Sequence, residues 1–231
     1  MSISAVIVAG GKGTRMNASV PKQFLTLNKK PILFYTLQKF NDIPQIDEIC
    51  LVIPKEFQED PFIIKAKSLF SKLKYVISGG KERQDSVYNG LSALNPKTKI
   101  VLIQDGVRPF TPLKSILKSI DIAKKFGAAL VAIPSTDTVK ILCPERGTVS
   151  TPDRSTVWLA QTPQTFQYQL ILKAYQKIKT EHLKITDDAQ AVEIYGHEVK
   201  IVEGSVENIK ITNKNDLKLA QEYLKTENKG I

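Results

Sequence analysis

Short apolar runs rich in β-branched residues alternate with segments of helical periodicity over the first 133 residues of the chain. The apolar runs predict five strands, at residues 5–8, 49–53, 74–77, 100–103 and 130–133. Between them, apolar residues recur at helical spacing and predict helices at residues 32–40, 62–70, 87–94 and 113–123. Because the strands are apolar on both faces, we predict an α/β fold, a Rossmann-like three-layer α/β/α arrangement around a mostly parallel sheet.

The alternation stops at about residue 137. Residues 137–158 combine Pro, Gly and Asp with alternating β-type residues, and this pattern predicts a β-arm that leaves the main body. Beyond the arm, the sequence predicts helices and strands in the order helix 167–179, helix 187–195, strand 199–202, strand 208–211 and helix 215–226. Because we find no repeat, low-complexity tract or linker, residues 1–231 are predicted to form a single domain with an arm.

The charge balance narrows the class of partner. The 231 residues include 33 Lys and Arg against 23 Asp and Glu, a net charge of +10, and this balance favours an anionic partner. Three classes fit: nucleic acid, an acidic membrane surface and a phosphorylated small molecule. The lysines are scattered and aromatic residues make up only 7% of the chain, which argues against a basic nucleic-acid-binding module.

The remaining composition favours a cytoplasmic protein that does not enter membranes. No apolar run approaches the roughly 20 residues of a membrane-spanning helix, and the first residues do not resemble a secretory signal. Cys50 and Cys143 lie far apart and form neither a CxxC motif nor a Cys/His cluster. This usage predicts no zinc site and fits a reducing compartment.

A glycine-rich loop follows the first predicted strand, with the sequence Ala9-Gly10-Gly11-Lys12-Gly13-Thr14-Arg15-Met16. Ligands of open parallel sheets bind beyond the carboxyl ends of strands, and glycines let backbone amides approach phosphate oxygens. The dinucleotide fingerprint fails at Met16, and no Walker A string occurs. Three cations at or just after the loop suit a triphosphate: Lys12, Arg15 and Lys22. The alternative is a tight turn with solvated lysines.

Two further motifs follow predicted strands. In Gly79-Gly80-Lys81-Glu82-Arg83-Gln84-Asp85-Ser86-Val87, backbone amides near Gly80 and the Ser86 hydroxyl suit the edge of a pyrimidine base; the alternative is a helix cap at Asp85 or Ser86. After the fourth strand, Asp105 suits a sugar hydroxyl or a magnesium ion. The alternative is that Asp105 and Arg108 form an ordinary ion pair.

Two more cations stand out in the second half of the chain. Arg154, on the predicted arm, suits a phosphate across a subunit interface, the alternative being an exposed surface arginine. Lys210 lies within the predicted strand 208–211 and indicates either a polar face at the site or an edge lysine.

In order, these motifs span nearly the whole chain: GGKGTRM at 10–16, PKQ at 21–23, GGKERQDSV at 79–87, DGVRP at 105–109, DTVK at 137–140, DRSTVWLAQTPQTF at 153–166, TDD at 186–188 and GSVENIKIT at 204–212. The ordered set resembles the 2-C-methyl-D-erythritol 4-phosphate cytidylyltransferases, a family of nucleotidyltransferases. The resemblance implies transfer of CMP from CTP to a methylerythritol phosphate in the non-mevalonate isoprenoid pathway, with release of pyrophosphate. It also implies Mg²⁺, held mainly by the CTP phosphates, and a homodimer whose arms cross. Ribitol-5-phosphate cytidylyltransferases share the glycine-rich loop and Pro-Lys-Gln, and form the alternative.

The resemblance also implies residue roles. Arg15 and Lys22 correspond to the pair that stabilises the α-phosphate, and Arg154 and Lys210 to the pair that positions the acceptor phosphate. The implied CTP-binding residues are Ala9, Gly10, Gly11, Gly13, Thr14, Gly80, Ser86, Asp105 and Gly106. The implied acceptor-binding residues are Asp105, Arg108, Thr138, Thr162 and Thr186. Two departures stand out: Lys81 replaces a frequent Asp, and Gln104-Asp105-Gly106-Val107 replaces a frequent His-Asp-Ala-Ala.

Overall fold

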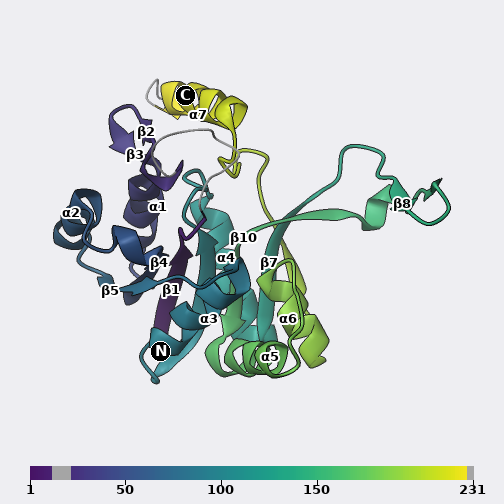
Figure 1. Ribbon diagram of the computed structural model, residues 1–231, viewed down its shortest axis with the longest axis horizontal. Helices are drawn as coiled ribbons and strands as arrows, with labels where there is room; N and C mark the ends of the chain where they lie inside the picture. Colours follow the sequence, from purple (N-terminus) through teal and green to yellow (C-terminus); the bar gives the residue numbers. More distant parts are fainter. Residues whose placement is uncertain (12–21, 228–231) are drawn as a thin grey trace.

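The computed structural model describes residues 1–11 and 22–227 and centres on a seven-stranded sheet of order β11-β7-β10-β6-β1-β4-β5 (Figure 1). Its strands are β1 (Ser2–Val8), β4 (Glu48–Ile53), β5 (Leu73–Ser78), β6 (Thr98–Asp105), β7 (Ala128–Pro134), β10 (Trp158–Gln167) and β11 (Lys200–Glu203). All neighbours pair in parallel except β10, which lies antiparallel between β6 and β7. The predicted α/β fold with a mostly parallel sheet is confirmed.

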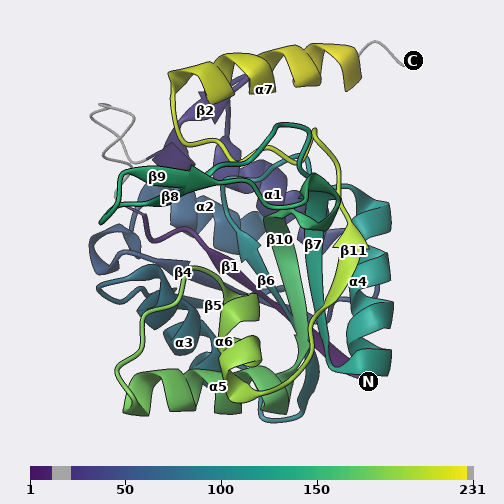
Figure 2. The ribbon, with the colours of Figure 1, turned by 90° about the vertical axis from the view of Figure 1, so that its right-hand side faces the viewer.

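Helices cover both faces of the sheet, and each face has its own apolar core (Figure 2). One core includes residues of α1 (Ile32–Asn41), α2 (Pro61–Leu69) and α4 (Leu113–Phe126). The other includes residues of α3 (Arg83–Ala93), α5 (Tyr168–Thr180) and α6 (Asp188–Tyr195). Among the described residues, no helix has the length and apolar character needed to cross a bilayer.

The C-terminal helix α7 (Lys214–Glu227) packs on a third, smaller core that includes Leu27, Ile32 and Val107. Short elements complete this side of the molecule: η2 (Lys22–Phe24), β2 (Thr26–Leu27), β3 (Lys30–Pro31) and η3 (Lys55–Phe57). The third core lies next to the turn that follows β6, because the backbone N–H of Ile211 donates to the carbonyl of Val107 over 3.0 Å. The chain between β11 and α7 is thereby fixed beside the end of β6.

The segment after β7 forms an antiparallel hairpin of β8 (Ile141–Cys143) and β9 (Thr148–Ser150), followed by η4 (Arg154–Thr156). Figure 1 shows it extending well away from the sheet. Its apolar side chains are mostly in contact with solvent: Ile141 is 55% exposed, Leu142 60% and Val149 60%. The hairpin therefore has almost no core of its own.

Two predictions about strands are wrong. Residues 208–211 form a loop, because the buried side chain of Asn208 is held by hydrogen bonds to other segments and Ile211 packs into the third core instead of joining a sheet. Ile209 and Ile211 alternate with polar residues, as in a strand, although no strand forms there. Conversely, β10 was not predicted as a strand, because its buried positions include Gln161, Thr162, Gln164 and Thr165 in place of apolar residues.

Candidate active site

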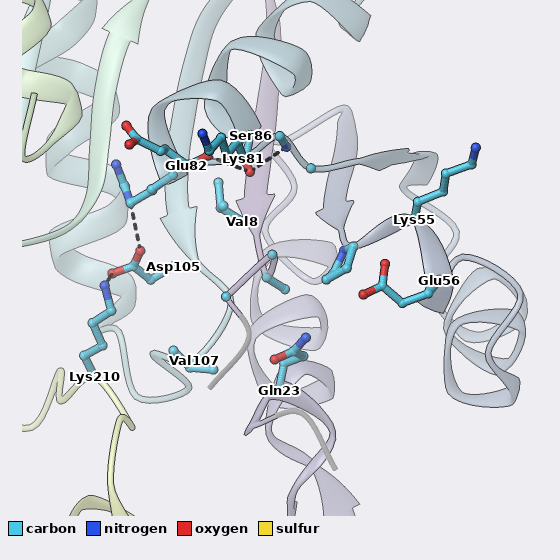
Figure 3. Close-up of a pocket in the computed structure, with 17 residues that line it drawn as sticks. Val8, Gln23, Lys55, Glu56, Lys81, Glu82, Ser86, Asp105, Val107 and Lys210 are labelled. Atoms are coloured by element: carbon cyan, nitrogen blue, oxygen red, sulfur yellow. Dashed lines mark hydrogen bonds and ion pairs between the residues drawn. The ribbon is translucent and has the colours of Figure 1, made fainter. Parts of the chain in front are cut away.

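The carboxyl ends of β1, β4, β5 and β6 meet at one edge of the sheet, and a pocket of about 530 Å³ opens there (Figure 3). Parallel pairing brings these ends together, as expected for ligand sites in open α/β sheets. The glycine-rich loop, the Gly79–Ser86 loop, Asp105 and Lys210 all contribute to its lining.

Most of the predicted CTP-binding residues lie at this pocket. Those that line it are Ala9, Gly10, Gly11, Gly80, Ser86 and Asp105. Gly106 lies directly behind it, where an added Cβ would be 3.0 Å from the Cβ of Ala9 and 3.3 Å from the carbonyl of Val8. The glycine thus lets the turn after β6 pack against the start of the glycine-rich loop. Gly13, Thr14 and Arg15 lie outside the described residues, and so does the side chain of Lys22.

The loop from Gly79 to Ser86 is held closed by its own hydrogen bonds. The N–H of Gly80 donates to the Ser86 hydroxyl over 3.0 Å, and that hydroxyl donates to the carbonyl of Glu82. Asp85 accepts from the N–H of Glu82, which is the N-terminal cap of α3, so Asp85 takes part in capping and Ser86 is not the cap. A Cβ at Gly80 would lie 2.2 Å from the Cβ of Asp85, so this turn requires glycine.

Asp105, the last residue of β6, is buried and bound by three cations. Its Oδ2 lies 2.9 Å from Nζ of Lys210 and 3.3 Å from Nε of Arg108, and its Oδ1 lies 3.5 Å from Nε of Arg83. Burial by itself raises the pKa of a carboxyl group, but here Arg83, Lys210 and Arg108 together hold the pKa of Asp105 well below its ordinary value. The carboxylate therefore stays ionised at neutral pH.

A buried asparagine fixes the loop that carries Lys210. Asn208 accepts from the Thr111 hydroxyl over 2.9 Å and donates to the Gln161 side chain over 3.1 Å and to the Thr162 carbonyl over 2.9 Å. Its own carbonyl accepts from Nη1 of Arg108 over 2.6 Å. The hydrogen bonds of Asn208, rather than a strand, thus fix the backbone that carries Lys210 two residues later.

Two predicted acceptor-binding residues lie beside Asp105. Arg108 is its ion-pair partner, so the simple ion-pair alternative describes a real contact, although Lys210 and Arg83 share the same carboxylate. The Thr162 hydroxyl accepts from the backbone N–H of Asp105 over 3.1 Å. Both side chains therefore face the end of β6.

The other predicted acceptor-binding residues lie away from the pocket of this chain. Arg154 and Thr138 belong to the exposed hairpin segment, where Nη1 of Arg154 donates to the Thr136 carbonyl over 3.2 Å. Thr186 precedes α6 and is exposed, and its hydroxyl donates to the side chain of Gln190. None of the three lines the pocket.

Among the pocket-lining residues to which the sequence analysis gave no role, Gln23 and Arg83 stand out. Gln23 is buried, and neither atom of its side-chain amide has a hydrogen-bond partner within the described part of the chain. Arg83 contacts both Asp105 and Asp188, which lies 105 residues further along the chain. The motif around Gly79 includes Arg83, but nothing in the sequence points to a partner that distant.

The described residues do not supply a ligand set for Mg²⁺. They contain no group of three or more His, Cys, Asp and Glu side chains that could hold a metal ion. Asp105 is the deeply buried carboxylate of the pocket, and its oxygens already contact three cationic side chains. A protein-held Mg²⁺ at this carboxylate does not fit that electrostatic environment.

The chain is similar to known proteins along almost its whole length. The model of the IspD family, 2-C-methyl-D-erythritol 4-phosphate cytidylyltransferase, matches residues 3–226. A Clostridium botulinum protein with that enzyme name is 45% identical over 221 residues, 96% of each chain. A Clostridium perfringens protein with the same name is 45% identical and aligns over 96% of this chain and 99% of its own.

Solved structures agree with this assignment. The crystal structure of 4-diphosphocytidyl-2C-methyl-D-erythritol synthase from Anaerococcus prevotii superposes with a TM-score of 0.86 at 36% identity, covering 97% of this chain and 96% of that one. The Francisella tularensis cytidylyltransferase superposes with a TM-score of 0.81 at 33% identity, covering 96% and 99%. The resemblance inferred from the motifs is confirmed, and the chain belongs to the family of 2-C-methyl-D-erythritol 4-phosphate cytidylyltransferases.

Proposed function

We propose that this pocket transfers CMP from CTP to 2-C-methyl-D-erythritol 4-phosphate, giving 4-diphosphocytidyl-2-C-methyl-D-erythritol and pyrophosphate. The observation that carries the proposal is the cluster of Arg83, Arg108 and Lys210 around one ionised carboxylate, next to a glycine-rich loop. Such a cluster suits an anionic acceptor beside a triphosphate. The relatives described above bear the methylerythritol name, so the ribitol-phosphate alternative is not favoured.

The reaction requires charge stabilisation rather than a general base. An oxygen of the acceptor phosphate is already anionic near neutral pH, so it forms a bond to the α-phosphorus while the bond from that phosphorus to the bridging oxygen of pyrophosphate breaks. In agreement, no histidine is among the described residues that line the pocket. The barrier comes mainly from repulsion between anions, and preorganised cations lower it.

The four predicted catalytic cations act as two pairs in this proposal. Arg15 and Lys22 stabilise charge on the α-phosphate as pyrophosphate leaves, and Arg154 and Lys210 hold the acceptor phosphate in line. The geometry of Lys210 supports its role, because its side chain is 36% exposed and reaches the pocket from a rigid loop. Asp105, as an ionised acceptor of hydrogen bonds, suits a hydroxyl of the ribose or of the acceptor.

We propose a homodimer in which the hairpin arm of one subunit completes the site of the other. Arg154 and Thr138 lie on the arm rather than at the pocket of their own chain, and the apolar side chains of the arm need a cover. Mixing two separately inactive variants, Arg154→Ala and Lys210→Ala, tests this. A site shared between subunits leaves one intact site per mixed dimer, so activity returns to about a quarter of the wild-type value after free exchange. No recovery in mixtures that have exchanged subunits would contradict it.

The family consists of nucleotidyltransferases, which generally depend on a metal ion. We propose Mg²⁺, held mainly by the phosphates of CTP, because the described side chains offer no ligand set of their own. Calorimetry should then detect no Mg²⁺ binding to the protein alone, while chelation by EDTA abolishes turnover and added Mg²⁺ restores it. Saturable Mg²⁺ binding without CTP would contradict the proposal.

A competition assay tests the acceptor directly. Methylerythritol 4-phosphate and ribitol 5-phosphate at equal concentration compete for one pool of CTP, and ³¹P NMR distinguishes the two products. We expect the methylerythritol product to dominate by at least about 10²-fold, as an acceptor that satisfies the polar groups of the site should. Equal formation of the two products would overturn the assignment of the acceptor.

The single-domain organisation and the cytoplasmic location remain predictions from the sequence.

A further inference from the structure

Arg83 connects three elements at the wall of the pocket. It is the first residue of α3, directly after the Gly79–Glu82 turn, and it lines the cavity. Its Nη1 and Nη2 donate to the two carboxylate oxygens of Asp188, over 2.9 and 2.8 Å. Its Nε lies 3.5 Å from Oδ1 of Asp105. One guanidinium therefore joins α3, the start of α6 and the end of β6.

The contact with Asp188 fixes the guanidinium rigidly. The Asp188 side chain is fully buried and is also bound by the Tyr175 hydroxyl, at 2.5 Å from Oδ1. A two-pronged contact of this kind sets the plane of the arginine as well as its position. Consequently the Nε–H of Arg83 has a fixed location beside Asp105, which a lone surface arginine would not have.

The two oxygens of Asp105 are thereby held from opposite sides. Arg83 contacts Oδ1, while Lys210 and Arg108 contact Oδ2. Without Arg83, the carboxylate would be bound at one oxygen only and could turn both oxygens toward Lys210 and Arg108. Lys210 would then be held more tightly by Asp105 and would be less available to an acceptor phosphate.

We propose that Arg83 is a positioning residue of the transfer reaction, which keeps the Asp105 carboxylate turned so that Lys210 can engage the acceptor phosphate. This inference rests on the proposed roles of Asp105 and Lys210 in the cytidylyl transfer. Arg83 would therefore act on binding of the acceptor phosphate, although it follows the loop that was predicted to bind the pyrimidine base of CTP. The competing explanation is structural: Arg83 only neutralises the buried Asp188.

A double variant separates the two explanations. Arg83→Gln combined with Asp188→Asn removes both charges of the buried pair and retains an oxygen that can accept from the Tyr175 hydroxyl. Its melting temperature should lie close to that of the wild type, whereas Arg83→Gln alone, which leaves Asp188 buried and unpaired, should melt lower. If Arg83 positions Asp105, kcat/KM for the acceptor stays about tenfold or more below the wild type in the double variant, while KM for CTP changes less than about threefold.

Three further variants complete the experiment. Asp188→Asn alone removes one of the two bonds that fix the guanidinium, so its kcat/KM for the acceptor should lie between those of the wild type and the double variant. Arg83→Lys keeps the charge but offers a single ammonium in place of the two-pronged guanidinium, so it should restore the melting temperature toward that of the wild type while kcat/KM for the acceptor stays low. Lys118→Gln, on the exposed side of α4, controls for the loss of a surface cation.

Pyrophosphate release measured at varied acceptor and saturating CTP, and the reverse, gives the kinetic constants. Full activity in the double variant would overturn the inference and leave the structural role. An equal loss for CTP and acceptor, or full activity in Arg83→Lys, would overturn it as well. An inactive wild-type protein would overturn the proposed function together with the inference, whereas an active wild type with a fully active double variant overturns the inference alone.

Discussion

Replacing Asp105 by Asn leaves three cations facing a neutral amide. Lys210 and Arg108 share Oδ2 of Asp105, and neither has an ion pair with another carboxylate among the described residues. Arg83 keeps its second partner, Asp188. The shape of the side chain is unchanged, so the substitution measures the effect of the charge itself. We expect a loss of stability and a loss of activity with different pH dependence.

The size of the stability loss follows from the geometry. At an effective dielectric constant of about 20, two unit charges 2.9 Å apart, the Asp105–Lys210 distance, attract each other by roughly 6 kcal/mol. Desolvation of a buried carboxylate cancels much of this, and removal of one member of a buried ion cluster typically costs about 3–5 kcal/mol. Because the Lys210 and Arg83 side chains are 36% and 30% exposed, water screens them, and we expect a value at the lower end, about 3 kcal/mol.

Urea unfolding of the wild type and the Asp105→Asn variant at several pH values checks this figure. The cations hold the pKa of Asp105 below its ordinary value, so its contribution is fully present above the unfolded-state pKa of about 3.9. The contribution is lost as the pH falls through the lower pKa of the folded state. The difference in the free energy of unfolding should therefore be constant between about pH 5 and 8 and shrink below about pH 4.

Two results would refute this reasoning. A difference below about 1 kcal/mol at pH 7 would mean that desolvation cancels the attraction of the three cations completely. A difference that grows on acidification would mean that the pKa of Asp105 is raised on folding, against the geometry. Inorganic phosphate provides a control, because an anion that enters the cluster should stabilise the Asp105→Asn variant more than the wild type.

Three other changes give distinct outcomes. Lys210→Ala should lower turnover by about 10²–10³-fold, measured as pyrophosphate release, with circular dichroism unchanged; a turnover within about threefold of the wild type would contradict its role. Gly80→Ala places a Cβ 2.2 Å from that of Asp85, so the loop must shift and KM for CTP should rise about tenfold or more, an effect that isothermal titration should also detect as weaker CTP binding. Burial, together with a nearby glutamate, raises the pKa of the Cys50 thiol to about 12, so iodoacetamide at pH 8 should alkylate only Cys143 in the native protein and both cysteines in urea, as mass spectrometry would detect.

The sequence alone was sufficient to predict the strands whose apolar pattern follows from their burial. The strands β1, β4, β6 and β7 were predicted because apolar side chains on both faces produce continuous apolar runs. Strand β5, most of which is half-buried, was predicted from the β-type residues Tyr75, Val76 and Ile77. Strand β10 lacks that pattern, because buried Gln161 and Gln164 satisfy their polar groups through distant partners such as Ser205 and Asp187. The periodicity of the sequence gives no sign of such distant partners. Conversely, residues 208–211 were predicted as a strand because Ile209 and Ile211 alternate with polar residues, although this segment forms a loop.

The candidate site was predictable in so far as it consists of strand ends. Glycine-rich and acidic motifs after parallel strands must gather at one edge, and Gly10, Gly80 and Asp105 do line one pocket. The links among them were not predictable, because they depend on which distant side chains meet. The clearest case is Arg83, whose partner Asp188 begins α6, a helix that is placed by its packing against α5 and β7.

Strand β10 has a consequence for how this protein tolerates insertions. Its first residue, Trp158, ends the arm, its last residue, Gln167, is the exposed N-terminal cap of α5, and Thr162 between them contacts the backbone of Asp105. A residue inserted within residues 158–160, which pair in regular register with β7, would reverse which side chains of that stretch face each side of the sheet, because strand side chains alternate. The turn at Gly147 between β8 and β9 has open space around it, so an added loop or a reporter there would leave that register intact. The length of the chain is thus fixed in the stem of the arm and not at its tip.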